Sequence, residues 1–151
     1  MAQEFKQFTG SCHCGLIKYT VDLSLDKFAD PKAIRCNCTW CQKGGMINFD
    51  ILPASSFKLI SPSSKSEMGD YNPRKGTVHR YFCKECGTQI LREGSYDFYG
   101  KTLEFCQINL VSLDQPQDGL DLSNVKIEYL DGKHENWLAG KKDVPFPEGV
   151  L

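Results

Sequence analysis

Six residues, Cys36-Asn37-Cys38-Thr39-Trp40-Cys41, carry three thiols in a C-x-C and a C-x-x-C spacing that share Cys38. Residues two apart in an extended segment point to the same side, and a C-x-x-C turn folds the third sulfur back toward the other two. The three sulfurs are therefore expected to converge on a soft or borderline cation such as Zn²⁺. Three protein ligands leave one tetrahedral position open, which is typical of a catalytic zinc.

Four further cysteines form two metal-type pairs, Cys12-x-Cys14 and Cys83-x-x-Cys86. Together they predict a closed Cys₄ site that ties the start of the chain to its middle, and closing so long a loop with a metal contributes folding energy. The alternative is that both sites are structural, with a fourth ligand for the three-thiol group. The candidates for that ligand are Cys106, His13, His79 and His134. Cys106 lies in a predicted strand, where a lone cysteine is more often a small core residue.

The composition is ordinary for one globular domain: 151 residues, 40% of them hydrophobic and 25% charged, with a net charge of −1. Nucleic acid is not expected as a partner, because phosphate binding needs a basic face. No apolar run reaches the length of a membrane span, so no membrane contact is expected either.

The redox compartment decides how the eight cysteines are interpreted. Residues 1–5 lack a charged segment followed by an apolar one, so no secretory signal is expected, and the protein is expected to be cytoplasmic. In that reducing compartment the cysteines are metal ligands or reactive thiols. Only in a secreted chain would they pair as disulfides.

Short runs of alternating residues predict a mainly β, single-domain fold, an antiparallel sheet assembly or small barrel pinned by metal. The expected strands are residues 16–21, 33–35, 46–52, 57–60, 78–82, 88–91, 103–110 and 125–129. Residues 22–32 and 61–77 are expected to be loops, and residues 133–138 one helical turn. The domain is expected to span residues 9–147, between an N-terminal arm of residues 1–8 and a tail of residues 148–151.

The cysteine motifs with their neighbours resemble one known family. The matching stretches are Gly10-x-Cys12-x-Cys14-Gly15, Cys36-x-Cys38-x-x-Cys41 and Arg80-x-Phe82-Cys83-x-x-Cys86-Gly87-Thr88. They resemble the glutathione-dependent formaldehyde-activating enzyme family, which includes the centromere protein V domain (GFA/CENP-V). The resemblance extends over most of the chain, and the combined motif is specific to the family but not to one reaction within it.

This resemblance implies a β-rich zinc fold, the Mss-like fold shared with methionine sulfoxide reductases and a Rab-binding chaperone. It also implies two zinc ions, a structural one on Cys12, Cys14, Cys83 and Cys86 and a catalytic one on Cys36, Cys38 and Cys41. The family condenses glutathione with formaldehyde to S-(hydroxymethyl)glutathione. Many members have histidine at the position of Asn37, and asparagine cannot act as an acid or base near neutral pH.

The resemblance implies the function of a glutathione-using carbon–sulfur lyase or synthase. It would act on formaldehyde or on another small electrophile or glutathione conjugate. Arg74, Lys75 and Arg80 are expected to bind the carboxylates of glutathione. The reaction also needs a proton donor, for which the candidates are His79, Tyr71 and Tyr81. With Cys36, Cys38 and Cys41, His79 completes the expected catalytic set.

Two other functions remain open. One is a non-enzymatic zinc module that binds a protein or chromatin, which a fully ligated three-thiol site would favour; the near-neutral charge disfavours chromatin. The other is methionine sulfoxide reduction, which needs a redox thiol outside the metal sites, and only Cys106 is available.

Overall fold

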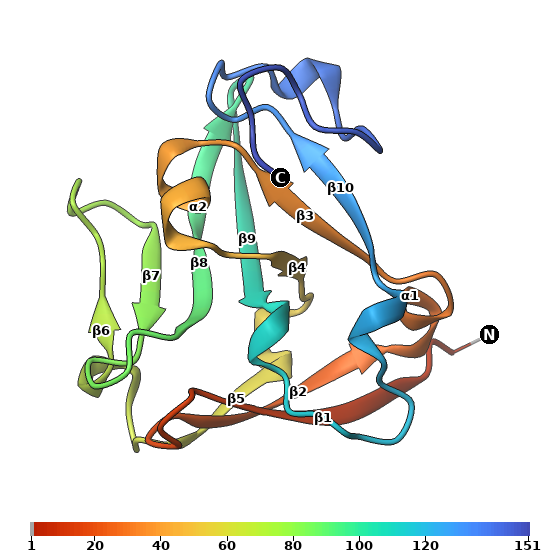
Figure 1. Ribbon diagram of the computed structural model, residues 1–151. Coiled ribbons are helices and arrows are strands. Elements are labelled where there is room, and N and C mark those ends of the chain that lie inside the picture. The colour runs from red at the N-terminus through yellow and green to blue at the C-terminus, as the bar shows by residue number, and fades with distance from the viewer. Residues whose placement is uncertain (1) are drawn as a thin grey trace.

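The computed structural model describes residues 2–151, except for the side chain of Phe28. It consists of two β-sheets and a few short helical segments (Figure 1). The strands are β1 Phe5–Ser11, β2 Lys18–Ser24, β3 Lys32–Cys36, β4 Asn48–Asp50, β5 Phe57–Ser61, β6 Gly69–Asp70, β7 His79–Phe82, β8 Gln89–Phe98, β9 Lys101–Asn109 and β10 Lys126–Leu130. The α-helices are α1 Leu25–Ala29 and α2 Thr39–Gly44. The 3₁₀ helices are η1 Ala54–Ser56, η2 Lys65–Glu67, η3 Leu110–Ser112, η4 Leu122–Asn124 and η5 Trp137–Ala139. The prediction of a mainly β, single-domain protein is confirmed.

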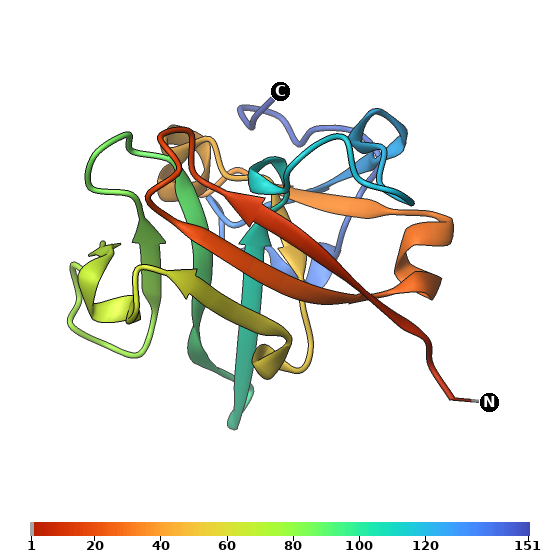
Figure 2. The same cartoon turned by 90° about the horizontal axis from the view of Figure 1, so that it is seen from below.

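The smaller sheet has the strand order β1-β2-β5 and lies toward the viewer in Figure 2. Its strands are antiparallel, with Phe5 opposite Ser24 at one end of the β1–β2 pair. Alternation directs Phe8 and Tyr19 inward, each 1% exposed. Strand β1 begins at Phe5 and therefore includes residues 5–8 of the expected N-terminal arm. The buried side chain of Phe8 packs this part of the strand into the core. The bounds of the arm, the domain and the tail stay a prediction.

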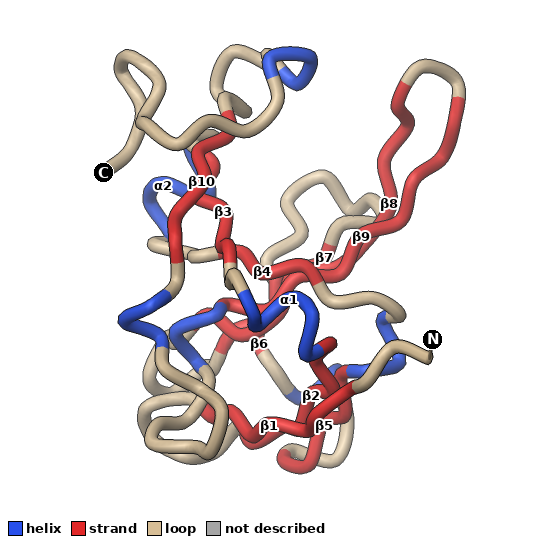
Figure 3. The backbone as a smooth tube through the Cα atoms, turned by 90° about the vertical axis from the view of Figure 1, so that its right-hand side faces the viewer, coloured by secondary structure: helices blue, strands red, loops and turns tan. Residues whose placement is uncertain are grey.

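The larger sheet has the strand order β10-β3-β4-β9-β8-β7-β6. All its neighbouring strands are antiparallel except β3 and β10, which run parallel. Strands β8 and β9 form its longest hairpin, which projects beyond the rest of the sheet in Figure 3. The sheet is therefore mixed rather than purely antiparallel.

The core lies between the two sheets. Apolar side chains from the small sheet, such as Phe8 and Val21, share one buried cluster with Phe49, Leu91 and Ile108 of the large sheet. Each such burial contributes roughly 1.5–3 kcal/mol relative to exposure in water. The sheets are thus held together by the hydrophobic effect in addition to any metal.

Three segments differ from the sequence expectation. The expected loop 22–32 contains the end of β2, helix α1 and the start of β3, because buried Leu23 continues the inward alternation of β2. The expected loop 61–77 contains η2, which a capping box between Ser64 and Glu67 stabilises, and the two-residue strand β6. Strand β8 continues to Phe98, well beyond the expected end at residue 91.

The helices of the described residues are all short, and none is both long and apolar enough to cross a membrane.

Candidate functional site

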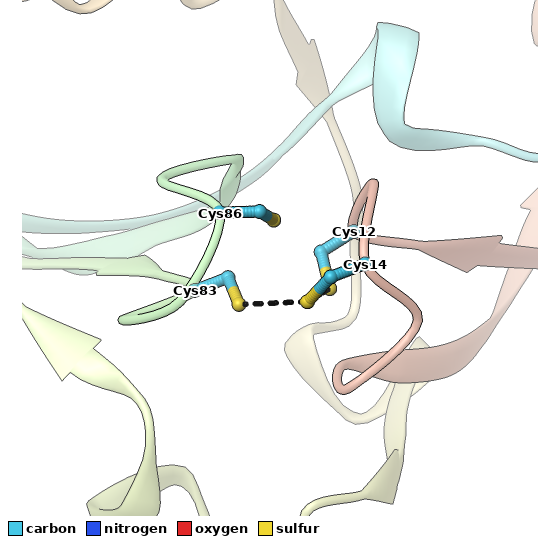
Figure 4. A group of neighbouring side chains, drawn as sticks. All are labelled: Cys12, Cys14, Cys83 and Cys86. Atoms are coloured by element: carbon cyan, nitrogen blue, oxygen red, sulfur yellow. Dashed lines mark hydrogen bonds between the residues drawn. The ribbon is translucent and has the colours of Figure 1, made fainter.

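The first cysteine cluster joins the two sheets. Cys12 and Cys14 lie in the turn after β1, and Cys83 and Cys86 lie in the turn between β7 and β8 (Figure 4). The four sulfurs lie within 4.8 Å of one another. Two of the distances are 3.5 Å, from Cys12 Sγ to Cys14 Sγ, and 3.6 Å, from Cys14 Sγ to Cys83 Sγ. A tetrahedron with Zn–S bonds of 2.3 Å has an edge of about 3.8 Å, so these thiols fit a closed zinc site.

Backbone turns hold these thiols in position. The Ile17 N–H donates to Cys12 Sγ over 3.2 Å, and the Gly87 N–H donates to the Cys83 carbonyl over 2.9 Å. The Thr88 hydroxyl lies 3.2 Å from Cys86 Sγ, and this hydrogen bond is the largest of several that lower the pKa of the Cys86 thiol to about 5. A thiol with a low pKa loses its proton readily to a metal.

The second cluster is built where β3 passes into α2. Cys36 ends β3, Cys38 is the N-cap of α2, and Cys41 lies in the first turn of that helix. Their sulfurs lie within 4.8 Å of one another. The Cys41 N–H donates to Cys38 Sγ over 3.4 Å, as a cap does at a helix N-terminus. The C-x-x-C spacing thus forms a helical turn whose exposed N–H groups favour thiolates.

Hydrogen bonds within the three-thiol cluster favour one negative charge. The bonds from the Cys36 and Cys41 thiols lower the pKa of Cys38. The Cys38 N–H also donates to Cys36 Sγ over 3.4 Å. The Asn48 amide nitrogen lies 3.7 Å from Cys41 Sγ and donates to it. Three thiols in this arrangement are soft ligands that suit Zn²⁺.

No fourth histidine, cysteine or acidic side chain among the described residues joins this cluster. The His79 ring bonds Asp70, with 2.6 Å between Nδ1 and Oδ2. Cys106 Sγ is buried and lies 3.9 Å from Glu93 Oε2. The other two candidates are His134, whose Nδ1 lies 2.9 Å from Asp131 Oδ1, and His13, which is exposed beside the four-thiol cluster. All eight cysteines are free of disulfides.

Asn37 is buried at 2% exposure, and its amide is used for structure. Its Nδ2 donates to Asp131 Oδ1 over 2.8 Å, and its Oδ1 accepts the Lys133 N–H over 2.8 Å. The bond from Asn37 is the main cause that lowers the pKa of Asp131. Asn37 therefore fastens the loop of residues 131–137, here called the covering loop, to the three-thiol cluster.

The covering loop touches the cluster through Gly132. A Cβ atom at Gly132 would lie 2.6 Å from Cys36 Sγ, 2.9 Å from Trp137 Cη2 and 3.2 Å from Cys38 Cβ. Only a residue without a side chain fits there. The edge of the Trp137 ring consequently lies next to the cluster, and nothing local in the sequence points to this contact.

Two guanidinium groups also lie near the three-thiol cluster. The Arg80 Cζ atom lies 4.8 Å from the centre of the ring of Trp40, a residue between Cys38 and Cys41. Arg92 lies directly opposite Arg80 in the β7–β8 pair, and its charge adds to the hydrogen bonds from Cys36 and Cys41 that lower the pKa of Cys38. Arg92 is not among the predicted site residues, because the expected strand ends at residue 91 and β8 continues beyond it. Arg74 and Lys75 are exposed in the connection between β6 and β7, and their expected role stays a prediction.

Alternation along β7 separates the candidate proton donors. Arg80 faces Trp40, whereas His79 and Tyr81 stack on each other at 5.6 Å on the opposite face. On that face His79 lines a recess of about 470 Å³ together with Glu93 and Cys106. This position offers no support for the expected catalytic role of His79, which stays a prediction. Tyr71 lies beside Arg80, since its N–H donates to the Arg80 carbonyl over 2.9 Å.

Comparison with known proteins gives a consistent result. Residues 7–127 match the family model described as glutathione-dependent formaldehyde-activating enzyme. Similar proteins from Penicillium rubens, Aspergillus flavus and Aspergillus oryzae are named, provisionally, as enzymes of that kind. Each is 25% identical over 130 residues, which cover 85% of this chain but 57% of the relative. The chain therefore spans little more than half the length of these relatives.

Proposed function

Because the chain belongs to the glutathione-dependent formaldehyde-activating enzyme family, we propose that it catalyses glutathione-using carbon–sulfur chemistry at the three-thiol cluster. The proposed reaction is that of a carbon–sulfur lyase of the S-(hydroxymethyl)glutathione synthase type. Its second substrate is formaldehyde, another small electrophile or a glutathione conjugate. The proposal rests on the convergence of Cys36, Cys38 and Cys41. Among the described residues, no fourth histidine, cysteine or acidic side chain joins them.

In this proposal the four-thiol cluster holds a structural zinc and the three-thiol cluster holds the catalytic one. Cys36, Cys38 and Cys41 would hold this zinc, which would favour the thiolate form of an incoming thiol. Arg80 lies on the correct side to bind a carboxylate of glutathione, and Arg74 and Lys75 are proposed as outer contacts. The cytoplasm, where thiols stay reduced, is the proposed location.

The bond changes in the formaldehyde reaction are simple. The glutathione thiol releases its proton, and its sulfur then forms a bond to the carbonyl carbon. The π electrons of the carbonyl move to oxygen, which takes up one proton and gives the hydroxymethyl thioether. We propose Tyr71 as the group that delivers this proton, because its backbone N–H donates to the carbonyl of Arg80, whose guanidinium packs on Trp40.

The covering loop and Trp40 give the site its shape. Trp137 reaches the cluster next to Cys36, and Trp40 packs under the Arg80 guanidinium. Both rings limit the access of water to the reacting sulfur, which strengthens electrostatic interactions there. Asn37 has a structural role in this proposal, so the absence of histidine at that position leaves the chemistry intact.

Cobalt substitution tests the proposal. Cobalt in both clusters has visible bands that report the number and type of its ligands, and the closed four-thiol site serves as an internal reference. We expect glutathione to change the spectrum saturably. That change should vanish in Cys38→Ser and persist in the control Cys106→Ser, which alters a cysteine outside both clusters.

The second candidate function is a non-enzymatic zinc module that binds another protein. If both cobalt sites are closed and glutathione changes neither, the enzymatic proposal is wrong and this candidate replaces it. If the spectrum responds, nuclear magnetic resonance of ¹³C-formaldehyde with glutathione then measures whether the protein accelerates formation of the hydroxymethyl thioether.

A further inference from the structure

A row of four polar side chains crosses one face of the large sheet. Arg80 lies opposite Arg92, Arg92 lies opposite Gln107, and Gln107 lies opposite Asp50. Residues that lie opposite each other in neighbouring strands direct their side chains to the same face. The contact between Arg80 and Trp40 identifies this as the face of the three-thiol cluster.

Hydrogen bonds along the row fix Arg92 in one orientation. Gln107 Nε2 donates to Asp50 Oδ1 over 2.7 Å, so the amide oxygen of Gln107 points the other way and accepts from Arg92 Nη1 over 2.9 Å. The Arg92 Cζ atom also lies 4.5 Å from the centre of the Phe105 ring. A guanidinium held by a ring face and an amide is preorganised to bind a ligand.

Neither guanidinium is paired with a carboxylate among the described residues. Arg80 Nε and Arg92 Nε are buried, and among the described residues neither atom has a hydrogen-bond partner. Because both Nε atoms are closed to solvent, a ligand can reach these guanidiniums only at their terminal nitrogens. Two adjacent arginines without a carboxylate partner favour binding of an anion from outside the chain.

The charges in this row lead to the same expectation. Like charges directly opposite each other in a sheet are destabilising. Burial, and next the charge of Arg92, lower the pKa of Arg80. Three thiolates around Zn²⁺ carry only one net negative charge, which cannot neutralise two guanidiniums. Asp50 reaches Arg92 only through Gln107. An anion that binds between the arginines would relieve this repulsion.

We infer that Arg92 and Arg80 together form a carboxylate-binding site that selects acidic thiols, such as glutathione, over neutral ones. This inference rests on the proposed function, because it assumes that a thiol substrate reaches the three-thiol cluster. The planar guanidinium matches a carboxylate with two parallel hydrogen bonds. Gln107 is a positioning residue, since it acts through Arg92.

The first measurement separates carboxylate recognition from thiol binding. S-methylglutathione keeps both carboxylates but has no free thiol, so calorimetry of its binding reports on the arginines alone. Its diethyl ester lacks the negative charges as well. We expect S-methylglutathione to bind the metal-loaded protein at least about tenfold more tightly than its diethyl ester, as a charge-assisted hydrogen bond allows. Equal affinities would overturn the inference.

Variants then assign the effect to Arg92. In Arg92→Gln the preference for the free acid should fall to about threefold or less, and Arg92→Lys should keep part of it because the charge remains. Lys58→Gln is the matched control, since it removes one exposed positive charge from β5 in the small sheet. A full preference in Arg92→Gln, or an equal loss in Lys58→Gln, would contradict the assignment.

Two outcomes distinguish this inference from the function on which it rests. If S-methylglutathione shows the preference but glutathione leaves the cobalt spectrum unchanged, the arginines bind carboxylates and the proposed chemistry is wrong. If glutathione changes the spectrum and the diethyl ester of glutathione does so at the same concentration, the chemistry stands and the carboxylate site is wrong. Loss of cobalt from the three-thiol cluster in Arg92→Gln, with no acid preference in Arg92→Lys, would mean that Arg92 only balances the charge of the metal.

Discussion

Replacement of Gly132 by alanine tests the contact between the covering loop and the three-thiol cluster. The added methyl group would lie 2.6 Å from Cys36 Sγ and 2.9 Å from Trp137 Cη2. Normal contacts between such atoms are about 3.5–4.0 Å, so the loop or the sulfur must move by roughly 1 Å. Gly132 is not among the glycines with a positive φ, so alanine meets no backbone strain there.

The size of the effect follows from the cost of overpacking, which is typically about 1–3 kcal/mol. Because Cys36 is a proposed metal ligand, this strain is relieved when the metal leaves. We therefore expect Gly132→Ala to weaken zinc binding at the three-thiol cluster by about 5- to 150-fold. The four-thiol cluster, which the covering loop does not form, should keep its affinity.

Competition with a coloured chelator measures both affinities in one titration. The matched control is Gly76→Ala, since Gly76 is also in a loop, has no positive φ and has nothing within 4 Å of an added Cβ. Thermal unfolding of both variants checks that the fold is retained. If Gly132→Ala binds both zinc ions as tightly as the control does, the proposed contact between the loop and the cluster is wrong.

Three further predictions concern other parts of the chain. Tyr71→Phe should lower kcat by about 100-fold, as loss of a proton donor does, whereas His79→Ala should change kcat by less than about twofold. Steady-state kinetics with glutathione and formaldehyde measure both values. The reverse pattern would restore His79 as the proton donor. Cys83→Ala should abolish the proposed structural zinc site and unfold the chain, because the free energy of zinc binding at such a site is about as large as the free energy of unfolding of a whole domain. A native near-ultraviolet circular dichroism spectrum of this variant would argue against the prediction. Burial, and next Glu93, raise the pKa of Cys106 to about 12, so this thiol stays protonated as the pH rises to 9 and should resist iodoacetamide in the folded, zinc-loaded protein. Peptide mass spectrometry with an unfolded control measures that modification, and rapid labelling of Cys106 in the folded protein would contradict its buried position.

The sequence alone was sufficient for the features that depend on local spacing. The C-x-C and C-x-x-C pairs converge because two or three residues fix the directions of their side chains, and both predicted cysteine clusters are present. The runs of alternating residues predicted most strands, because neighbouring residues of a strand direct their side chains to opposite faces. The family was also recognisable, because each of its motifs is a short run of neighbouring residues.

The surroundings of the clusters depend on strand register and on contacts between distant segments. Arg92 meets Arg80 only because β7 and β8 pair in one particular register, and a shift of one residue would move Arg92 to the face of His79. Likewise, Asn37 bonds Asp131 across 94 positions of the chain, so its structural role has no local signal. The sequence alone therefore determined which thiols can bind metal, whereas tertiary structure decided which charged and aromatic groups surround them, because strand pairing and loop packing set long-range neighbours.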